Sequence, residues 1–291
     1  MRPEVSVIIP CYNAGKFIAR TIRSVTGQSY TNWELIIIDD GSGDDSAAII
    51  RPFLDNPKIR YIYQENAGVS NARNHGLAEA TADFICFLDA DDLFLPDNLL
   101  KKAEVLRNNP EIGLVHSDLQ PIGMEDELLP GREAGMEGTD LHYAILSWER
   151  CVITVPSSIM VRRSIFKETG EWDPEFTTAA DQDLMIRIAA RYPIARIPEM
   201  LTGYRIVPGS MGKQAAVFEK DHLGVYRKAE RLQLFQNSRH RKRSFAKLHL
   251  IIAGMWWQAG KPFKTIKHLV RSILFSVRPF WTAVSSKITG R

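Results

Sequence analysis

Short apolar runs that alternate with helical segments are the feature of this sequence that most limits its fold. Runs rich in β-branched residues occur at VSVII (5–9), ELIIID (34–39), IRYIY (59–63) and DFICFLD (83–89). Segments with helical spacing follow them at about 14–28, 45–54, 68–80 and 96–109. Apolar strands separated by helices are typical of βαβ units, in which helices cover both faces of a parallel sheet. We therefore expect an α/β fold with a mostly parallel sheet flanked by helices.

The second half of the sequence gives a weaker pattern. The alternation fades after about residue 117, and a stretch rich in Gly, Glu and Met (121–138) predicts a mobile loop. VITVPSSIMVRR (152–163) predicts a strand, and DQDLMIRIAARY (181–192) predicts an amphipathic helix. From about Gln214 onward the pattern is helical. The change in composition predicts a catalytic domain over 1–212 and a helical, basic C-terminal region over 213–291.

Charge is distributed unevenly along the chain. The 291 residues include 37 Lys/Arg and 34 Asp/Glu, a net charge of +3. Residues 231–291 contain 13 Lys/Arg and no acid, which leaves 24 Lys/Arg against all 34 acids in residues 1–230. Such a tail, interleaved with Trp, Phe and Leu, fits two interpretations: a solvated helical pair packed on the catalytic domain, or an amphipathic region at an anionic membrane surface. Nucleic-acid binding is not expected, because no recognition motif accompanies the basic residues.

The cysteines and the apolar runs limit the cellular context. Three cysteines far apart in the sequence, without metal-ligand spacing, favour a reduced, cytosolic environment. The first residues pass directly into a strand-like run without a signal-peptide pattern. No apolar stretch approaches the roughly 20 residues that span a bilayer. We expect a chain that is soluble or lies on a membrane surface.

Polar clusters follow each of the first four predicted strands. They are Pro10-Cys11-Tyr12-Asn13, Asp39-Asp40-Gly41-Ser42, Glu65-Asn66-Ala67-Gly68 and Asp89-Ala90-Asp91-Asp92. In open α/β sheets, ligands bind outside the carboxyl ends of the strands. Crowded carboxylates repel one another unless a cation compensates, and hard oxygen ligands suit Mg²⁺ or Mn²⁺ shared with substrate phosphates. An isolated Asp-rich turn is also common as a solvated cap of a strand or helix end. The prediction of a ligand site therefore depends on four polar strand ends that meet at one edge of the sheet.

Together these motifs resemble family 2 glycosyltransferases with the GT-A fold. The residues that carry the resemblance are VSVIIPCYN (5–13), ELIIIDDGSGD (34–44), ENAGVSNARNHG (65–76), FLDADDLFLP (87–96), DQDLMIRIA (181–189) and GYRIVPGSM (203–211). The resemblance implies a mixed, mostly parallel GT-A sheet and a nucleotide-sugar donor, UDP-linked, with Mg²⁺ or Mn²⁺ bridging its diphosphate. It also implies inverting transfer to a hydroxyl of a glycan or lipid-linked acceptor, in cell-envelope polysaccharide synthesis at the inner face of the membrane.

The resemblance assigns the nucleotide end of the site to the loops after the first three strands. Pro10 and Tyr12 match positions that cradle the base, with Asn13 in the same motif. Asp40 matches the carboxylate that accepts a hydrogen bond from uracil, and Gly68 is expected to supply a backbone conformation or a close approach. Structural roles without ligand contact stay open for two residues of these loops. Tyr12 would then only cover the sheet edge, and Asp39 would only cap its turn.

The diphosphate end of the site involves one arginine and the acidic turn. Arg73 matches a basic residue that faces the nucleotide, although pairing with Asp40 or Glu65 is the alternative. Asp89 and Asp91 form the D-x-D motif. The direct metal ligand is Asp91 or Asp92, and the sequence does not choose between them.

The expected general base is Asp181, which the resemblance places at a helix start, with Asp183 as a supporting residue. The alternative is that Asp181 only caps the helix. Two departures from the family pattern occur: Ala180 replaces an acid, and Val207 stands where relatives often carry His, so that Arg205 or another group must act in its place. Trp172, in the acceptor region, either stacks on a sugar or packs in the core.

Two other functions compete with transfer. A sugar-phosphate nucleotidyltransferase also joins nucleotides, metals and sugars, but PCYNAGK (10–16) fits its Gly-rich basic loop poorly. A non-catalytic module that binds nucleotide sugars would be expected to have lost the acidic pairs, and these are intact.

Overall fold

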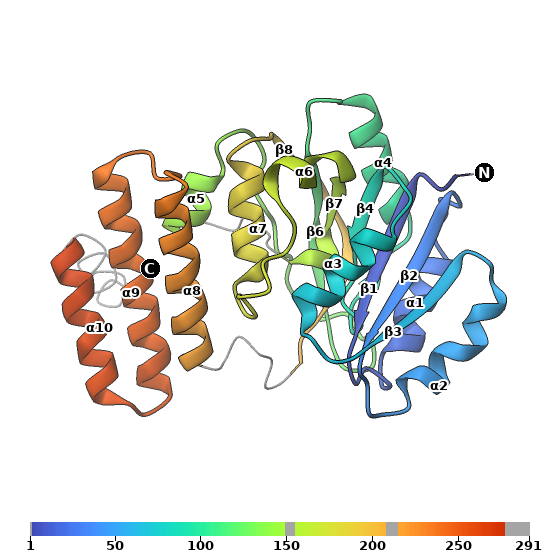
Figure 1. Cartoon of the computed structure of the whole chain (residues 1–291), viewed down its shortest axis with the longest axis horizontal. Helices are drawn as coiled ribbons and strands as arrows, with labels where there is room; N and C mark the ends of the chain where they lie inside the picture. The colour runs from blue at the N-terminus through green and yellow to red at the C-terminus, as the bar shows by residue number, and fades with distance from the viewer. Residues whose placement is uncertain (1, 149–154, 208–214, 277–291) are drawn as a thin grey trace.

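The computed structural model describes residues 2–148, 155–207 and 215–276, and these contain one eight-stranded sheet (Figure 1). The strands lie in the order β3-β2-β1-β4-β7-β6-β8-β5. Their bounds are β1 Val5–Cys11, β2 Trp33–Asp40, β3 Ile59–Gln64, β4 Phe84–Phe87, β5 Leu93–Phe94, β6 Leu114–Ile122, β7 Ile159–Arg162 and β8 Ile194–Arg205.

The sheet combines a parallel half with a mixed half. Strands β3, β2, β1 and β4 are parallel to one another, and β6 is parallel to β8. Strand β7 is antiparallel to β4 and β6, and β5 is antiparallel to β8. The expectation of a mixed, mostly parallel GT-A-type sheet is confirmed. Because β1, β2 and β3 end in register, with Cys11 opposite Asp39 and Asp40 opposite Gln64, the loops that follow them meet at one edge.

Helices cover both faces of the sheet. Alternate side chains of β1 face opposite sides, so that Val7 and Ile9 belong to one hydrophobic cluster and Ile8 to another. Helices α1 (Ile18–Thr26), α2 (Ser46–Ile50) and α4 (Asn98–Asn108) contribute to the first cluster. Helices α3 (Val69–Glu79), α5 (His142–Ser147), α6 (Phe166–Thr169) and α7 (Ala180–Ala189) contribute to the second. A Cβ on Gly76 would lie 2.3 Å from Ile8 Cγ2, so glycine is what lets α3 pack closely on β1.

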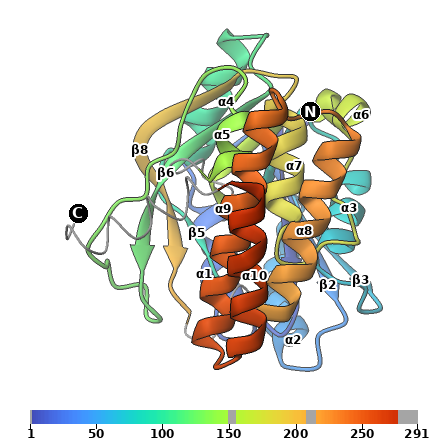
Figure 2. The same ribbon diagram turned by 90° about the vertical axis from the view of Figure 1, so that its left-hand side faces the viewer.

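Three further helices extend the second cluster away from the sheet. They are α8 (Ala215–Arg231), α9 (Ser238–Gln258) and α10 (Pro262–Phe275), which stand side by side next to α5 and α7 (Figures 1 and 2). Tyr226 of α8 is fully buried and donates its hydroxyl to the carbonyl of Leu146. The expected C-terminal helical extension is confirmed as far as Phe275, whereas the predicted boundary at 212/213 lies outside the described residues. Among the described helices, none has the length and apolar character that crossing a membrane demands.

Candidate active site

Asp40, the last residue of β2, binds the end of β3 and the loop between β3 and α3. Its Oδ1 accepts hydrogen bonds from Gln64 Nε2 (2.7 Å) and the backbone N–H of Ala67 (2.9 Å), and its Oδ2 accepts one from the N–H of Gly68 (2.9 Å). Gly68 has a φ of 91°, and a Cβ there would contact nothing, so the backbone conformation requires the glycine. A carboxylate offers about four acceptor positions, so Asp40 keeps one for a ligand.

The loops after β1 and β2 are bound to each other. Asn13, with a φ of 50°, donates its N–H to Ser42 Oγ (3.0 Å) and accepts from the N–H of Gly43 at its Oδ1 (2.8 Å). Asp39 caps this turn, because its Oδ1 accepts from the N–H of Ser42 (2.8 Å). Tyr12 is 56% exposed, so its ring is accessible to a ligand at this edge.

Pro10 is a buried part of the scaffold under this loop. It lies within β1 opposite Ile38 of β2. Its side chain is therefore positioned by the sheet itself, two residues before the exposed Tyr12.

The Asp-rich turn after β4 gives its carboxylates different environments. Asp92 is 1% exposed; its Oδ2 accepts from Ser157 Oγ (2.6 Å) and its Oδ1 from the backbone N–H of Arg205 (2.9 Å). Burial, followed by the charges of Asp91 and Asp89, raises the pKa of Asp92 well above its usual value. Asp92 thus joins the turn to the 156–158 segment and to the end of β8.

Asp89 and Asp91 are the two more accessible carboxylates of the turn. Burial and then the charge of Asp89 raise the pKa of Asp91. A divalent cation would relieve this repulsion, and two hard oxygen donors suit Mg²⁺ or Mn²⁺ whose other ligands are phosphate and water. Among the described residues, no group of three His, Cys, Asp or Glu side chains could hold a metal ion without such help.

Arg73 of α3 connects the nucleotide end of the site with the Asp-rich turn. It is 6% exposed, donates from Nη2 to Asp89 Oδ1 (2.6 Å), and lies 4.4 Å from the ring centroid of Trp172. Its ion pair is therefore with Asp89, and the alternative of pairing with Asp40 or Glu65 is wrong. Trp172 is 2% exposed and packs in the core under this arginine.

Asp181 lies in the first turn of α7. Its Oδ1 accepts from the backbone N–H of Gln182 (2.7 Å). Burial raises its pKa to about 6; Arg73 opposes this shift and Asp89 adds to it. Asp181 therefore shares one electrostatic environment with the arginine and the acidic turn, although more than 90 residues separate them in the sequence.

Helix α8 holds the segment that leads into α7, a contribution that the local sequence pattern does not signal. Asp221 Oδ2 accepts from the backbone N–H groups of Thr177 (2.8 Å) and Thr178 (2.7 Å). Lys228 Nζ binds Asp183 Oδ2 at 2.9 Å, and Asp183 also pairs with Arg187 at 2.7 Å. Asp183 is thereby a structural residue, and Asp181 is left as the more accessible acid of this helix start.

Arg205 organises the turn from the end of β8. Its Nε donates to the carbonyl of Asp91 (2.6 Å), and its other nitrogens bind the carbonyl of Gly123 and the carboxylate of Asp126. Its guanidinium is thus used to hold loops. His116 is fully buried and binds the carbonyl of Met136.

Comparisons with known proteins show the family of the chain. A family model described as glycosyl transferase family 2 matches residues 6–170. An uncharacterized glycosyltransferase of Rickettsia felis is 31% identical over 71% of this chain and 34% of its own length. A second, of Rickettsia bellii, is 30% identical over 70% of this chain and 29% of its own, so the chain spans about a third of these relatives. A putative teichuronic acid biosynthesis glycosyltransferase, TuaG of Bacillus subtilis, is 29% identical over 81% of this chain and 92% of its own.

Solved structures share the fold. Residues 1–349 of Staphylococcus aureus TarS superpose with a TM-score of 0.64 at 17% identity, over 99% of this chain and 92% of that one. The mannosyltransferase PcManGT from Pyrobaculum calidifontis, in complex with GDP-Man and Mn²⁺, gives a TM-score of 0.60 at 17% identity over 97% and 88%. With the family model covering more than half of the sequence, the chain belongs to the family 2 glycosyltransferases.

Proposed function

We propose that this protein is an inverting, metal-dependent glycosyltransferase that moves a sugar from a UDP-linked donor to a hydroxyl of a glycan or lipid-linked acceptor. The observation that carries the proposal is the shared environment of Asp181, Arg73 and Asp89. A half-buried carboxyl whose pKa is raised to about 6, in the same electrostatic environment as Arg73, is suited to proton abstraction beside a diphosphate.

The nucleotide lies against the loops after β1, β2 and β3. Tyr12, presented by Pro10, stacks on the base; Asn13 and Gly68 shape the loops; and Asp40 accepts a hydrogen bond from uracil. The TarS neighbour was also solved in complex with UDP-GlcNAc, with a TM-score of 0.63 at 16% identity, which supports a uridine donor.

The diphosphate lies between Arg73 and the Asp-rich turn. Arg73, which pairs with Asp89, also binds the diphosphate through its guanidinium group. Asp91 is the metal ligand. The two hydrogen bonds that Asp92 accepts within the protein favour a supporting role for that residue. Bound Mg²⁺ or Mn²⁺ would stabilise the negative charge of the leaving diphosphate. The Mn²⁺ in the PcManGT complex supports this choice of metal.

Asp181 acts as the general base. It accepts the proton of the acceptor hydroxyl as that oxygen bonds to the anomeric carbon and the bond from this carbon to the diphosphate breaks. Activation of the acceptor by a single base corresponds to inversion without a covalent intermediate. Since its pKa is raised to about 6, Asp181 is ionised at neutral pH and still basic enough to assist.

The test replaces the base and leaves the donor site intact. Asp181→Asn is expected to keep metal-dependent UDP binding, measured by thermal shift, and to lose transfer roughly 10²–10⁴-fold. Below pH 6 the wild-type kcat is expected to fall about tenfold per pH unit, because protonated Asp181 cannot accept a proton. Glu175→Gln, at an exposed acid of the preceding loop, is the control. Unchanged transfer by Asp181→Asn would disprove the role.

Two alternatives predict different products. A nucleotidyltransferase would release pyrophosphate from a nucleoside triphosphate, and a binding module would bind UDP-sugar without hydrolysing or transferring it. A screen of nucleotide sugars with and without Mn²⁺, read as thermal shift and as UDP release, separates all three. Absence of any metal-dependent stabilisation by a nucleoside diphosphate would contradict the glycosyltransferase proposal.

The relatives and the charge pattern support a proposal for the acceptor and the cellular site. The name of TuaG, teichuronic acid biosynthesis, supports a role in cell-envelope polysaccharide synthesis. We place catalysis in residues 1–212 and assign to 213–291 the contact with an anionic membrane surface, which holds a cytoplasmic enzyme at the inner face of the membrane.

A further inference from the structure

Helix α10 packs against the protein mainly through polar side chains, with Phe275 stacked at its end, and exposes most of its apolar residues. Thr265, His268 and Ser272 are at most 6% exposed. The large apolar residues of the other face are exposed: Phe263 (88%), Ile266 (56%), Val270 (49%), Ile273 (41%) and Leu274 (79%). Their spacing of three, four, three and one residues places them along one side of the helix. This set, the α10 stripe, is the reverse of what a helix on a water-soluble surface normally shows.

Basic residues border the α10 stripe along its length. Lys264, Lys267 and Arg271 are exposed and fall, at helical spacing, between the stripe and the face that packs on α9. Trp257, at the end of α9 that leads into α10, is 70% exposed. An apolar stripe with basic residues beside it and an aromatic residue near its end has the composition of a helix that lies in a membrane interface.

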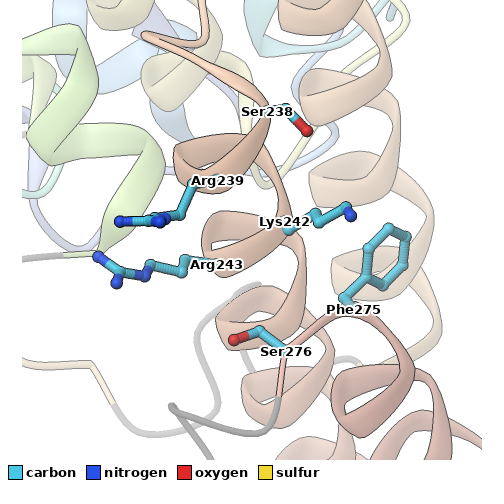
Figure 3. Close-up of a pocket in the computed structure, with 6 residues that line it drawn as sticks. All are labelled: Ser238, Arg239, Lys242, Arg243, Phe275 and Ser276. Carbon is cyan, nitrogen blue, oxygen red and sulfur yellow. The ribbon is translucent and has the colours of Figure 1, made fainter.

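A basic pocket lies where α10 ends. The pocket has a volume of about 510 Å³ and is lined by Ser238, Arg239, Lys242, Arg243, Phe275 and Ser276 (Figure 3). Its three basic residues come from the first turns of α9, and Figure 3 shows Lys242 extending toward Phe275.

Among the described residues, the three cations of this pocket have no counter-charge. Within residues 2–148, 155–207 and 215–276, no ion pair or side-chain hydrogen bond involves Arg239, Lys242 or Arg243, whereas the intervening Arg241 pairs with Glu230. Residues 231–291 contain no acid that could neutralise them. Unpaired cations around one pocket have the chemistry that binds phosphate oxygens.

Charge complementarity selects the occupant of this surface. A second copy would bring the same stripe and the same cations face to face, and like charges would repel. The sequence after Ser276 contains only basic ionisable side chains, so it cannot neutralise the pocket either. A bilayer with anionic headgroups offers both an apolar layer for the stripe and phosphates for the pocket.

We propose that α10 lies in the interface of an anionic bilayer, with the α10 stripe in the acyl boundary and Arg239, Lys242 and Arg243 bound to phospholipid phosphates. This deepens the membrane part of the proposed function by assigning it to one helix face and one pocket. It would hold the enzyme beside a lipid-linked acceptor.

The test is co-sedimentation of the full chain with vesicles at low salt. The wild-type chain is expected to bind vesicles that contain phosphatidylglycerol and not vesicles of phosphatidylcholine alone. Changing Arg239, Lys242 and Arg243 together to Gln is expected to weaken binding about a hundredfold, because each basic residue near an anionic surface contributes severalfold. The control changes three exposed basic residues elsewhere, Arg51, Lys167 and Arg191, to Gln and should bind nearly as wild type.

A second variant tests the stripe. Phe263→Ser with Leu274→Ser, at exposed positions, is expected to reduce vesicle binding at least tenfold without changing thermal stability. Equal binding of the basic-pocket variant and its control would overturn the proposal. So would a dimer in sedimentation that the stripe variant dissociates, since the face would then be a self-interface. Metal-dependent UDP binding, measured without vesicles, is expected to be unchanged in every variant, so failure of the catalytic proposal would be seen separately.

Discussion

At the scale of single residues, three neighbouring carboxylates have different hydrogen-bond partners, and we propose different roles for them. Asp92 has an acceptor bond on each oxygen and is buried; Asp89 is paired with Arg73; and Asp91 lies between them with a raised pKa. A buried acceptor with two donors directed at it stabilises the fold. A carboxylate that is crowded by a like charge is instead stabilised when a cation arrives.

Paired alanine substitutions should separate these roles. Asp92→Ala removes the acceptor for Ser157 Oγ and for the N–H of Arg205, and is expected to lower the free energy of unfolding by about 1–3 kcal/mol in urea titrations. Asp91→Ala is expected to leave that free energy nearly unchanged and to abolish the Mn²⁺-dependent part of UDP binding. Wild-type stability in Asp92→Ala would contradict the supporting role.

The directions of the side chains in this acidic turn could not be predicted from the local sequence. The motif predicts an acidic turn, but the choice between Asp91 and Asp92 depends on Ser157 and Arg205, which lie 65 and 113 residues after Asp92. Likewise, Arg73 pairs with Asp89 and not with a residue of its own strand–helix unit. Local spacing gives the residue types, whereas contacts between distant segments give each side chain its direction.

At the scale of elements, the position of α7 depends on α8. Asp221 Oδ2 accepts from the N–H groups of Thr177 and Thr178 and from the hydroxyl of Thr178 (3.1 Å). These residues immediately precede the helix that carries Asp181. Two backbone donors fixed by one buried carboxylate hold the entry to α7 in a single conformation, which makes Asp221 a positioning residue.

Asp221→Ala is expected to lower kcat by about 10-fold or more with little change in the KM for donor, because the loop before the base is loosened while the nucleotide loops are untouched. Looser packing should also admit water to Asp181 and move the acid limb of the kcat profile below pH 6. Asp221→Asn retains a side-chain oxygen for the same donors and should largely restore both properties. If Ala and Asn variants have the same pH profile as wild type, α8 does not position the base.

Element prediction succeeded where one local pattern was sufficient. The runs at 5–9, 34–39, 59–63 and 83–89 correspond to β1–β4. Strands β1, β2 and β4 are fully buried, and β3 is a partly buried strand. Strand β6 was not predicted, because its interior carries polar residues such as Asp118. Arg132 (2.6 Å) and Arg196 (2.8 Å) satisfy Asp118 from 14 and 78 residues away. Burial of such a strand depends on partners that hydrophobic periodicity does not include.

At the scale of the whole molecule, the three C-terminal helices are joined by a buried polar chain. His249 Nδ1 of α9 lies 2.9 Å from His268 Nδ1 of α10, and His268 Nε2 lies 3.1 Å from Glu219 Oε1 of α8. Trp256 Nε1 donates to the other oxygen of Glu219 (2.7 Å). All these bonds form when both histidines are neutral and His249 donates to His268. The docking of α10 therefore depends on protonation.

Acidification is expected to loosen α10 before the sheet. Burial, followed by the charge of His268, lowers the pKa of His249 to about 4, and burial also lowers that of His268, although Glu219 opposes that shift; Arg271 and Lys267 lower both. These folded-state pKa values lie below the ordinary histidine value of 6.5. The stabilisation of the packed α10 by the two neutral histidines is therefore fully present above pH 6.5 and is lost as the pH falls toward 4.

Hydrogen exchange measured from pH 6.5 to pH 4, corrected for intrinsic rates, provides the test, with α4 on the opposite face of the sheet as internal reference. Amides of α10 should lose protection relative to those of α4. In the double variant His249→Phe and His268→Gln, the first ring can still stack on Phe275, the second side chain can still donate to Glu219, and no imidazole remains to titrate. Its α10 protection should change much less with pH. Parallel loss of protection in α4 and α10, or an equal pH dependence in the double variant, would assign the acid sensitivity to other groups.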